Sequence, residues 1–166
     1  LGLLSAIIGG NMSSRLFSEV REKRGLCYYV RSEISQFHEG GLLGGSAGVD
    51  PQRVEEAVKV SLNEFHELAH GDKPVTSKEL ERAREYVIGK MTLGLEDSQS
   101  VAQFYGLKQL LHGSIETPEE VIEKMRKVTL EEVQTLAKEL IKPGQLRFGL
   151  IGDFNQDKIK EIISKY

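Results

Sequence analysis

Apolar residues recur at helical spacing through most of the chain after residue 50. Asp50 and Pro51 supply an N-cap and a proline at the first helical position, and Gly71 ends the run. The pattern therefore predicts an amphipathic helix over residues 54–70. Its apolar stripe consists of Val54, Ala57, Val58, Ser61, Leu62, Phe65, Leu68 and Ala69.

Further helical segments follow, and most of them begin with a residue that caps helices well. A Ser/Thr cap, Thr76 or Ser77, opens residues 76–95, and Asp97 precedes the next apolar run. Thr117 and Thr129 each have a glutamate three residues later, which is the pattern of a capping box. We expect helices over 76–95, from 97 to about 111, over 117–128 and 129–141, and at the C-terminal end over 156–166.

Strand patterns are confined to two places. Aromatic and β-branched residues between 26 and 49, interrupted at His38-Glu39-Gly40-Gly41, predict a β-hairpin, and the run over 145–154 predicts a late strand. A short helix over about 13–25 precedes the hairpin, and residues 1–10 look like the tail of a helix. These elements predict an α+β fold, with a mainly antiparallel sheet covered by helices, in a single domain over residues 1–166.

Composition narrows the possible partners. The 25 acidic and 22 basic residues give a net charge of -3, and the positive residues form no stripe that could track phosphates, so nucleic acid is not an expected partner. The apolar opening is too short to span a bilayer, so no membrane association is expected. The single cysteine, Cys27, excludes an internal disulfide and suits a reducing compartment. The cytoplasm is the default expectation, and the mitochondrial matrix or a disulfide-free secreted protein remains open.

Residues 66–70 match the His-Glu-x-x-His pattern by which many peptidases bind zinc. Two histidines four apart share a helix face, and the glutamate between them can activate a water molecule. However, both His66 and His70 lie 110° to 150° from the apolar stripe at about 100° per residue. No third ligand follows at the spacing of such enzymes. A surface helix is the favoured interpretation, and metal held by the two imidazoles without catalysis remains open.

A more specific pattern is "GGNMSSRLFSEVREKRGLCYYV" at residues 9–30. It resembles the C-terminal half of the pitrilysin and mitochondrial processing peptidase family of zinc metallopeptidases. The later segments "VDPQRVEEAVKVSLNEF", "SKELERAREYVIGKM", "DSQSVAQFYG" and "LRFGLIGDF" are similar to the same half. The resemblance extends from residue 1 to about residue 155. It implies that the chain is a fragment corresponding to the C-terminal peptidase-family domain.

The resemblance also implies which residues act. In that family the zinc ligands lie in the N-terminal half, in an H-x-x-E-H pattern that is absent here, so zinc is expected in the parent enzyme with ligands outside this chain. The metal-free half supplies an arginine and a tyrosine seven residues apart, which Arg21 and Tyr28 match. They would orient the substrate and polarise its scissile carbonyl. Alternatively, Arg21 pairs with a surface carboxylate and Tyr28 packs in the sheet. Tyr29, on the opposite strand face, is the natural control.

The resemblance implies the C-terminal domain of a zinc-dependent endopeptidase, which helps to enclose and orient a peptide and is inactive alone. Its partners would be a zinc-bearing N-terminal half, or a homologous subunit, and the peptide substrate. The alternative is a non-catalytic family member that acts as a partner subunit or assembly protein. Because such a half exposes the face that meets the other half, self-association of the chain is expected. Cys27 is expected to be a buried small hydrophobe.

Overall fold

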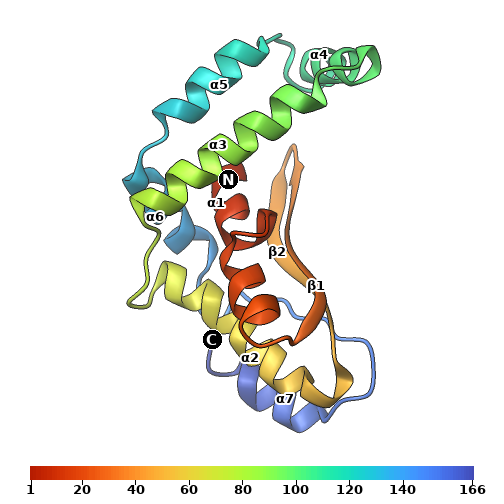
Figure 1. The fold of residues 1–166 in the computed structure, drawn as a ribbon, viewed down its shortest axis with the longest axis vertical. Helices are drawn as coiled ribbons and strands as arrows, with labels where there is room; N and C mark the ends of the chain where they lie inside the picture. Colours follow the sequence, from red (N-terminus) through yellow and green to blue (C-terminus); the bar gives the residue numbers. More distant parts are fainter.

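The computed structural model describes the backbone of residues 1–166 and every side chain except that of His112. The first part of the chain contains α1 (Gly2–Ser5), η1 (Ala6–Gly10), η2 (Phe17–Glu22), β1 (Cys27–Phe37), β2 (Gly40–Val49) and η3 (Pro51–Arg53). The second part contains α2 (Val54–Ala69), α3 (Ser77–Gly94), α4 (Ser98–His112), α5 (Pro118–Lys127), α6 (Leu130–Leu140) and α7 (Gln156–Ile163). Figure 1 shows their arrangement.

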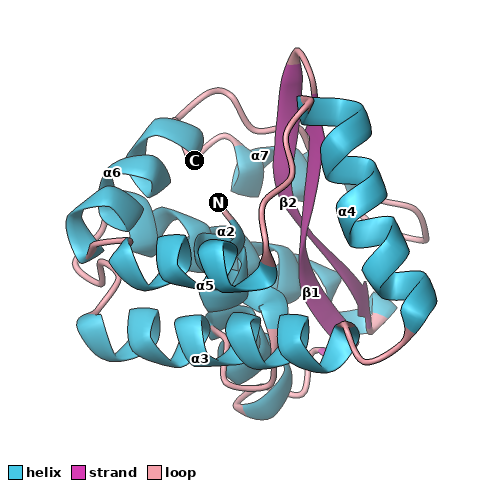
Figure 2. Cartoon of the chain, turned by 90° about the horizontal axis from the view of Figure 1, so that it is seen from above, coloured by secondary structure: helices cyan, strands magenta, loops and turns pink.

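The predicted hairpin is present. β1 and β2 pair antiparallel from Cys27 opposite Val49 to Phe37 opposite Gly40, which leaves a turn of two residues, His38 and Glu39. The helices gather mainly on one side of this hairpin (Figure 2). The α+β prediction, with an antiparallel sheet covered by helices, is confirmed.

The N-terminal helices pack directly on β1. α1 continues into η1, whose hydrogen bonds follow the wider π spacing, and a Cβ at Gly9 would overlap the backbone nitrogen of Ser32. Glycine therefore lets the helix backbone touch the strand. Next to this contact the Ser32 hydroxyl donates to the Ser5 carbonyl at 2.6 Å. The residues of α1, η1 and η2 that fill the main core include Leu4, Ile8 and Val20.

The α2 helix joins two apolar clusters. Ala57, Leu68 and Ala69 contribute to the main core, together with α1, η1, α3 and α6. Val54, Val58 and Leu62 form a smaller cluster with Ile159 of α7. The predicted apolar stripe of α2 is thus confirmed, because its residues face the interior. They pack against different neighbours along the helix. The capping boxes predicted at Thr117–Glu120 and Thr129–Glu132 form, and Thr76 and Glu79 form a third.

The strand predicted over residues 145–154 is wrong. Residues 145–150 have no regular secondary structure, and β1 and β2 form a sheet of two strands. Leu146, Phe148 and Leu150 face the side chains of β2 across a cavity of about 500 Å³. A strand needs a neighbouring backbone for its hydrogen bonds, and in the described part of the chain this apolar run pairs with neither β1 nor β2.

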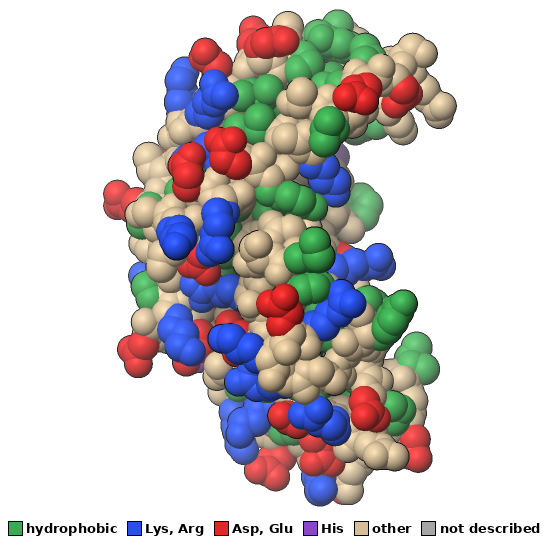
Figure 3. All heavy atoms as spheres, in the orientation of Figure 1, with side chains coloured by type: hydrophobic (Ala, Val, Ile, Leu, Met, Phe, Trp, Pro, Cys, Tyr) green, Lys and Arg blue, Asp and Glu red, His purple; other side chains and the backbone are tan. Residues whose placement is uncertain are grey.

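The α4 helix stands away from the other helices. It extends at the top right of Figure 1, and the molecular surface is hollowed beneath it in Figure 3. None of its described side chains is buried, and Leu107, Leu110 and Leu111 are exposed. Its apolar residues formed a helix as predicted but have no core to cover. Among the residues described, no helix combines the length and apolar composition needed to cross a bilayer.

Candidate functional site

Arg21 lies in the last turn of η2, just before the chain turns into β1. The helix closes with the Gly25 amide donating to the Arg21 carbonyl at 2.9 Å, and Gly25 takes the left-handed conformation with φ 59°. Glycine adopts this conformation without strain. The Arg21 guanidinium carbon is 4.8 Å from the centroid of the Phe17 ring. The exposed cation is therefore held by a ring on its own helix.

The basic residues around Arg21 already have carboxylate partners. Arg24 pairs with Glu19 at 2.6 Å, Lys23 with the same carboxylate at 2.5 Å, and Arg31 with Glu33 at 2.9 Å. Among the described side chains, no carboxylate pairs with the Arg21 guanidinium. The alternative in which Arg21 serves a surface ion pair is thus not the arrangement found. Its hydrogen-bond donors are available to a ligand.

Tyr28 is the extra residue of a β-bulge. Cys27 lies opposite Val49 and Tyr29 lies opposite Gly48, so Tyr28 has no partner of its own on β2. A bulge interrupts the alternation of side chains along a strand and can redirect one of them. Tyr28 is 87% exposed although Val30, two residues later, is buried. The alternative in which Tyr28 packs in the sheet is therefore not the arrangement found.

Tyr29 is held more closely than Tyr28. Its ring lies across Gly48, and the Arg31 guanidinium carbon is 5.9 Å from the ring centroid. The exposed fraction of Tyr29 is 49%. Because of the bulge, simple alternation does not describe these two tyrosines, and both reach solvent. Tyr29 remains a suitable control because its ring is occupied by contacts within the sheet.

Cys27 packs against the main core and is half-buried. Burial raises the pKa of its thiol, and the nearby positive charge of Arg21 opposes this effect only in part. A thiol that is held protonated is a poor nucleophile. The prediction of a small hydrophobe agrees with this environment. The η2 helix and β1 also contact each other.

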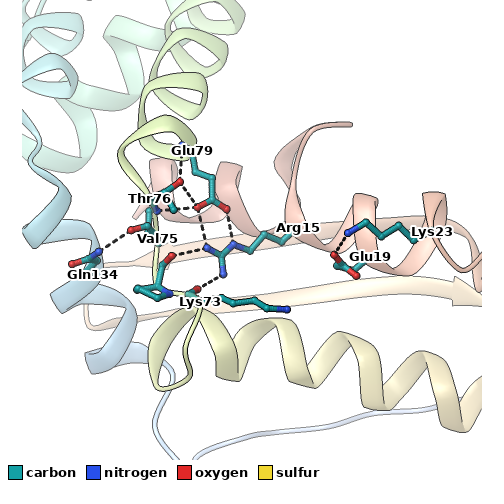
Figure 4. A network of polar contacts seen from close by, with 9 residues as sticks. Arg15, Glu19, Lys23, Lys73, Val75, Thr76, Glu79 and Gln134 are labelled. Carbon is teal, nitrogen blue, oxygen red and sulfur yellow. Dashed lines mark hydrogen bonds and ion pairs between the residues drawn. The ribbon is translucent and has the colours of Figure 1, made fainter.

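An arginine that the sequence reasoning did not single out anchors this region. Arg15 donates to both carboxylate oxygens of Glu79, at 2.6 and 3.0 Å, and to the carbonyl oxygens of Lys73 and Pro74, at 2.6 and 2.9 Å. Its side chain is 12% exposed and that of Glu79 is 19% exposed. Figure 4 shows this clamp between Arg15, just before η2, and the loop that precedes α3. Burial would raise the pKa of Glu79, but hydrogen bonds from Arg15 and Thr76 outweigh it and lower the pKa.

Glu64 of α2 is a second acidic residue that the sequence did not reveal. It is only 7% exposed. Burial raises the pKa of its carboxyl group and the charge of Glu19 adds to this effect, while Arg15, Lys73 and Arg24 act against it. Glu64 thus lies among the charged residues that surround the clamp.

The histidines of residues 66–70 take part in other contacts. The His70 ring nitrogen donates to the Ile141 carbonyl, and the His66 ring meets the edge of Tyr166 with centroids 5.7 Å apart. The two imidazole centroids are 5.9 Å apart. Within the side chains that the structure describes, no three His, Cys, Asp or Glu residues form a group that could hold a metal ion. The histidines instead line the cavity between α2 and residues 140–150.

Comparisons with known proteins identify the family of this chain. Residues 1–87 match the family described as the peptidase M16 inactive domain. The chain is 33% identical to an uncharacterized zinc protease of Streptomyces coelicolor, over 99% of this chain and 36% of that protein. It is 36% identical to one of Bacillus subtilis, over 83% of this chain and 33% of that protein. The chain thus spans about one third of the length of these relatives.

A solved structure shows the same fold. The peptidase M16 inactive domain from Pseudomonas fluorescens superposes with a TM-score of 0.70 at 24% identity, over 84% of this chain and 33% of that one. Arg21, Tyr28 and the clamp formed by Arg15 and Glu79 all lie within the matched residues 1–87. This chain belongs to the peptidase M16 inactive-domain family.

Proposed function

We propose that this chain is the metal-free half of a zinc endopeptidase, in which Arg21 and Tyr28 contact the peptide substrate opposite a zinc-bearing half. The observation that carries the proposal is that Arg21, at the end of η2, has no carboxylate partner among the described side chains, and that Tyr28, at the start of β1, is exposed. Residues 1–166 would act as one structural unit, since α2 contributes to both apolar clusters.

The chemistry of the two groups suits this role. As a peptide bond is hydrolysed, negative charge develops on the carbonyl oxygen, and donors that are already in position stabilise it. The Tyr28 hydroxyl can donate one hydrogen bond, and the Arg21 guanidinium is a fixed fork of donors that stays charged. Neither group serves as a nucleophile here. Zinc in the other half would supply the activated water.

The neighbouring residues support these roles. Glu19 pairs with both Lys23 and Arg24, whereas Arg21, among the described side chains, has no carboxylate partner. The bulge turns Tyr28 outward while Cys27 and Val30 keep the strand attached to the core. Both side chains are therefore exposed on elements that pack against the main core, which suits the orientation of a substrate.

The direct test uses an enzyme reconstituted with the zinc-bearing half and a peptide substrate. We expect Arg21→Ala and Tyr28→Phe each to lower kcat/KM by about 100-fold, the usual loss when one donor to an oxyanion is removed. The matched controls are Arg82→Ala, an exposed arginine on α3, and Tyr29→Phe, which keeps the ring over Gly48. Both controls should stay within about twofold of the parent enzyme.

Other results would separate the alternatives. If the reconstituted enzyme is active and neither substitution lowers kcat/KM, Arg21 and Tyr28 have no role in turnover. If the complex forms but shows no peptidase activity with any zinc-bearing partner, an assembly role is favoured over an enzymatic one. The chain alone should be inactive, because the zinc ligands would lie in the other half.

We also propose that the isolated chain self-associates. Exposed apolar side chains on α4 and around the hairpin tip, such as Leu110 and Phe37, would normally be covered in the longer protein. Association with another copy of the chain would bury these exposed apolar side chains. Location in the cytoplasm remains a prediction from the single cysteine.

A further inference from the structure

We propose that Phe17 is a positioning residue for Arg21, and that its ring fixes the direction in which the guanidinium approaches substrate. This inference rests on the proposed function of Arg21. It assigns a role to a side chain that the family resemblance did not single out.

The geometry is that of a cation over an aromatic face. The Arg21 guanidinium carbon lies 4.8 Å from the Phe17 centroid, within the range in which the ring quadrupole attracts a cation. Both residues belong to η2, which has π-helical hydrogen bonding. Phe17 also packs against the main core, so the platform itself is fixed.

Among the described side chains, none forms a hydrogen bond or ion pair with the Arg21 guanidinium, so the contact with the ring matters. Arg15 has four hydrogen bonds to Glu79, Lys73 and Pro74, whereas the Arg21 guanidinium lies over the Phe17 ring. An exposed arginine without such a contact samples many rotamers, and ordering it on a substrate costs entropy. A ring that restricts the guanidinium beforehand would reduce this cost without occupying any of its N–H donors.

The stacking can be measured in the isolated chain. The aromatic ring should shift the NMR signals of the Arg21 δ-methylene protons upfield. We expect Phe17→Leu and Phe17→Met to remove this shift while keeping an apolar side chain against the core, and Phe17→Tyr to retain it. Phe104→Leu is the matched control, because Phe104 lies 5.2 Å from the Lys108 ammonium on a different helix.

The role in turnover requires the reconstituted enzyme. We expect Phe17→Leu to lower kcat/KM between about fivefold and about a hundredfold. The lower value corresponds to an exposed cation–π contact, and the upper value to a misplacement of about 1 Å. Phe17→Tyr should restore activity to within about twofold, and Phe104→Leu should leave it unchanged.

A double-mutant cycle separates positioning from a general structural effect. If Phe17 acts through Arg21, Phe17→Leu should cause no further loss in an Arg21→Ala enzyme. An equal loss in both backgrounds would overturn the positioning role while leaving Arg21 its function. Loss of the NMR shift without any change in kcat/KM would also overturn it, provided that Arg21→Ala lowers activity. An unchanged kcat/KM for Arg21→Ala itself would refute the proposed function of Arg21, and with it the role of Phe17.

Discussion

The ring of Tyr29 occupies the space above Gly48 that a larger residue would need. A Cβ added at position 48 would come within 2.5 Å of the Tyr29 Cε1 atom. The contact lies immediately next to the bulge at Tyr28, since Tyr29 and Gly48 are the first paired residues beyond it. The glycine therefore helps to hold the strand in the arrangement that exposes Tyr28.

Gly48→Ala should lower the free energy of unfolding by about 1 to 2 kcal/mol, because the new methyl group displaces the ring. Gly44→Ala on the same strand is the control, as no atom lies within 4 Å of the added Cβ. It should be neutral or slightly stabilising. Urea unfolding of both variants would measure the difference, and equal midpoints would contradict the role of the contact.

Arg15→Met should destabilise the chain by about 3 kcal/mol, because it leaves the mostly buried Glu79 carboxylate without its partner. Lys23→Met removes an exposed pair with Glu19 and should change stability by less than about 0.5 kcal/mol. Denaturant midpoints measured at pH 7 test both. A loss for Arg15→Met no greater than that for Lys23→Met would show that the clamp is not a stabilising element.

Glu64→Gln should stabilise the chain at neutral pH. The pKa of Glu64 is raised in the folded state, so the folded chain holds this proton more tightly than the unfolded chain does. The free energy of unfolding therefore falls as the pH rises from the ordinary carboxyl pKa through the pKa of Glu64 in the folded state. The neutral amide removes this dependence. Thermal unfolding at pH 7 should show a higher Tm for the variant, and the difference should shrink below about pH 4. A variant that is less stable at pH 7 would mean that the carboxylate is favourably paired.

Zinc should not bind the histidines tightly. After dialysis against trace zinc, mass spectrometry should find well below one equivalent per chain, and His66→Ala should not change the amount. The reason is that His70 is engaged by the Ile141 carbonyl and His66 by Tyr166. One equivalent that disappears in the variant would assign the chain a metal site of its own.

Sedimentation should detect association of the isolated chain. We expect the average mass to rise with concentration, and Leu110→Glu on α4 to reduce this effect because it places a charge on an exposed apolar residue. Leu93→Glu, at another exposed site near the end of α3, tests whether the effect is specific to α4. A monomer over a wide concentration range would refute the proposal.

Much of the fold followed from local signals in the sequence. Capping residues such as Thr117 and Thr129 act on their own helix, so their positions could be read directly. The strand expected over 145–154 failed because a strand depends on a partner far away in the sequence, and apolar residues do not specify that partner. The bulge at Tyr28 was missed for the same reason, since it is defined by pairing with β2.

The candidate site was predicted only in part. Arg21 and Tyr28 came from the family resemblance, and the sequence did not reveal that Arg21 lies on Phe17. The contact between Arg15 and Glu79 joins residues 64 positions apart, so periodicity within either helix could not indicate it. Glu64 was hidden because a glutamate next to an apolar stripe is usually solvated.

The clamp made by Arg15 would also affect how readily a peptidase cuts this chain. Proteases cut segments that can leave the surface and adopt an extended form, and exposed loops between helices are their usual targets. The guanidinium of Arg15 binds the backbone carbonyls of Lys73 and Pro74, in the loop between α2 and α3. That loop is thereby held against the body of the molecule, so the residue that anchors the site would also protect the chain from being cut there.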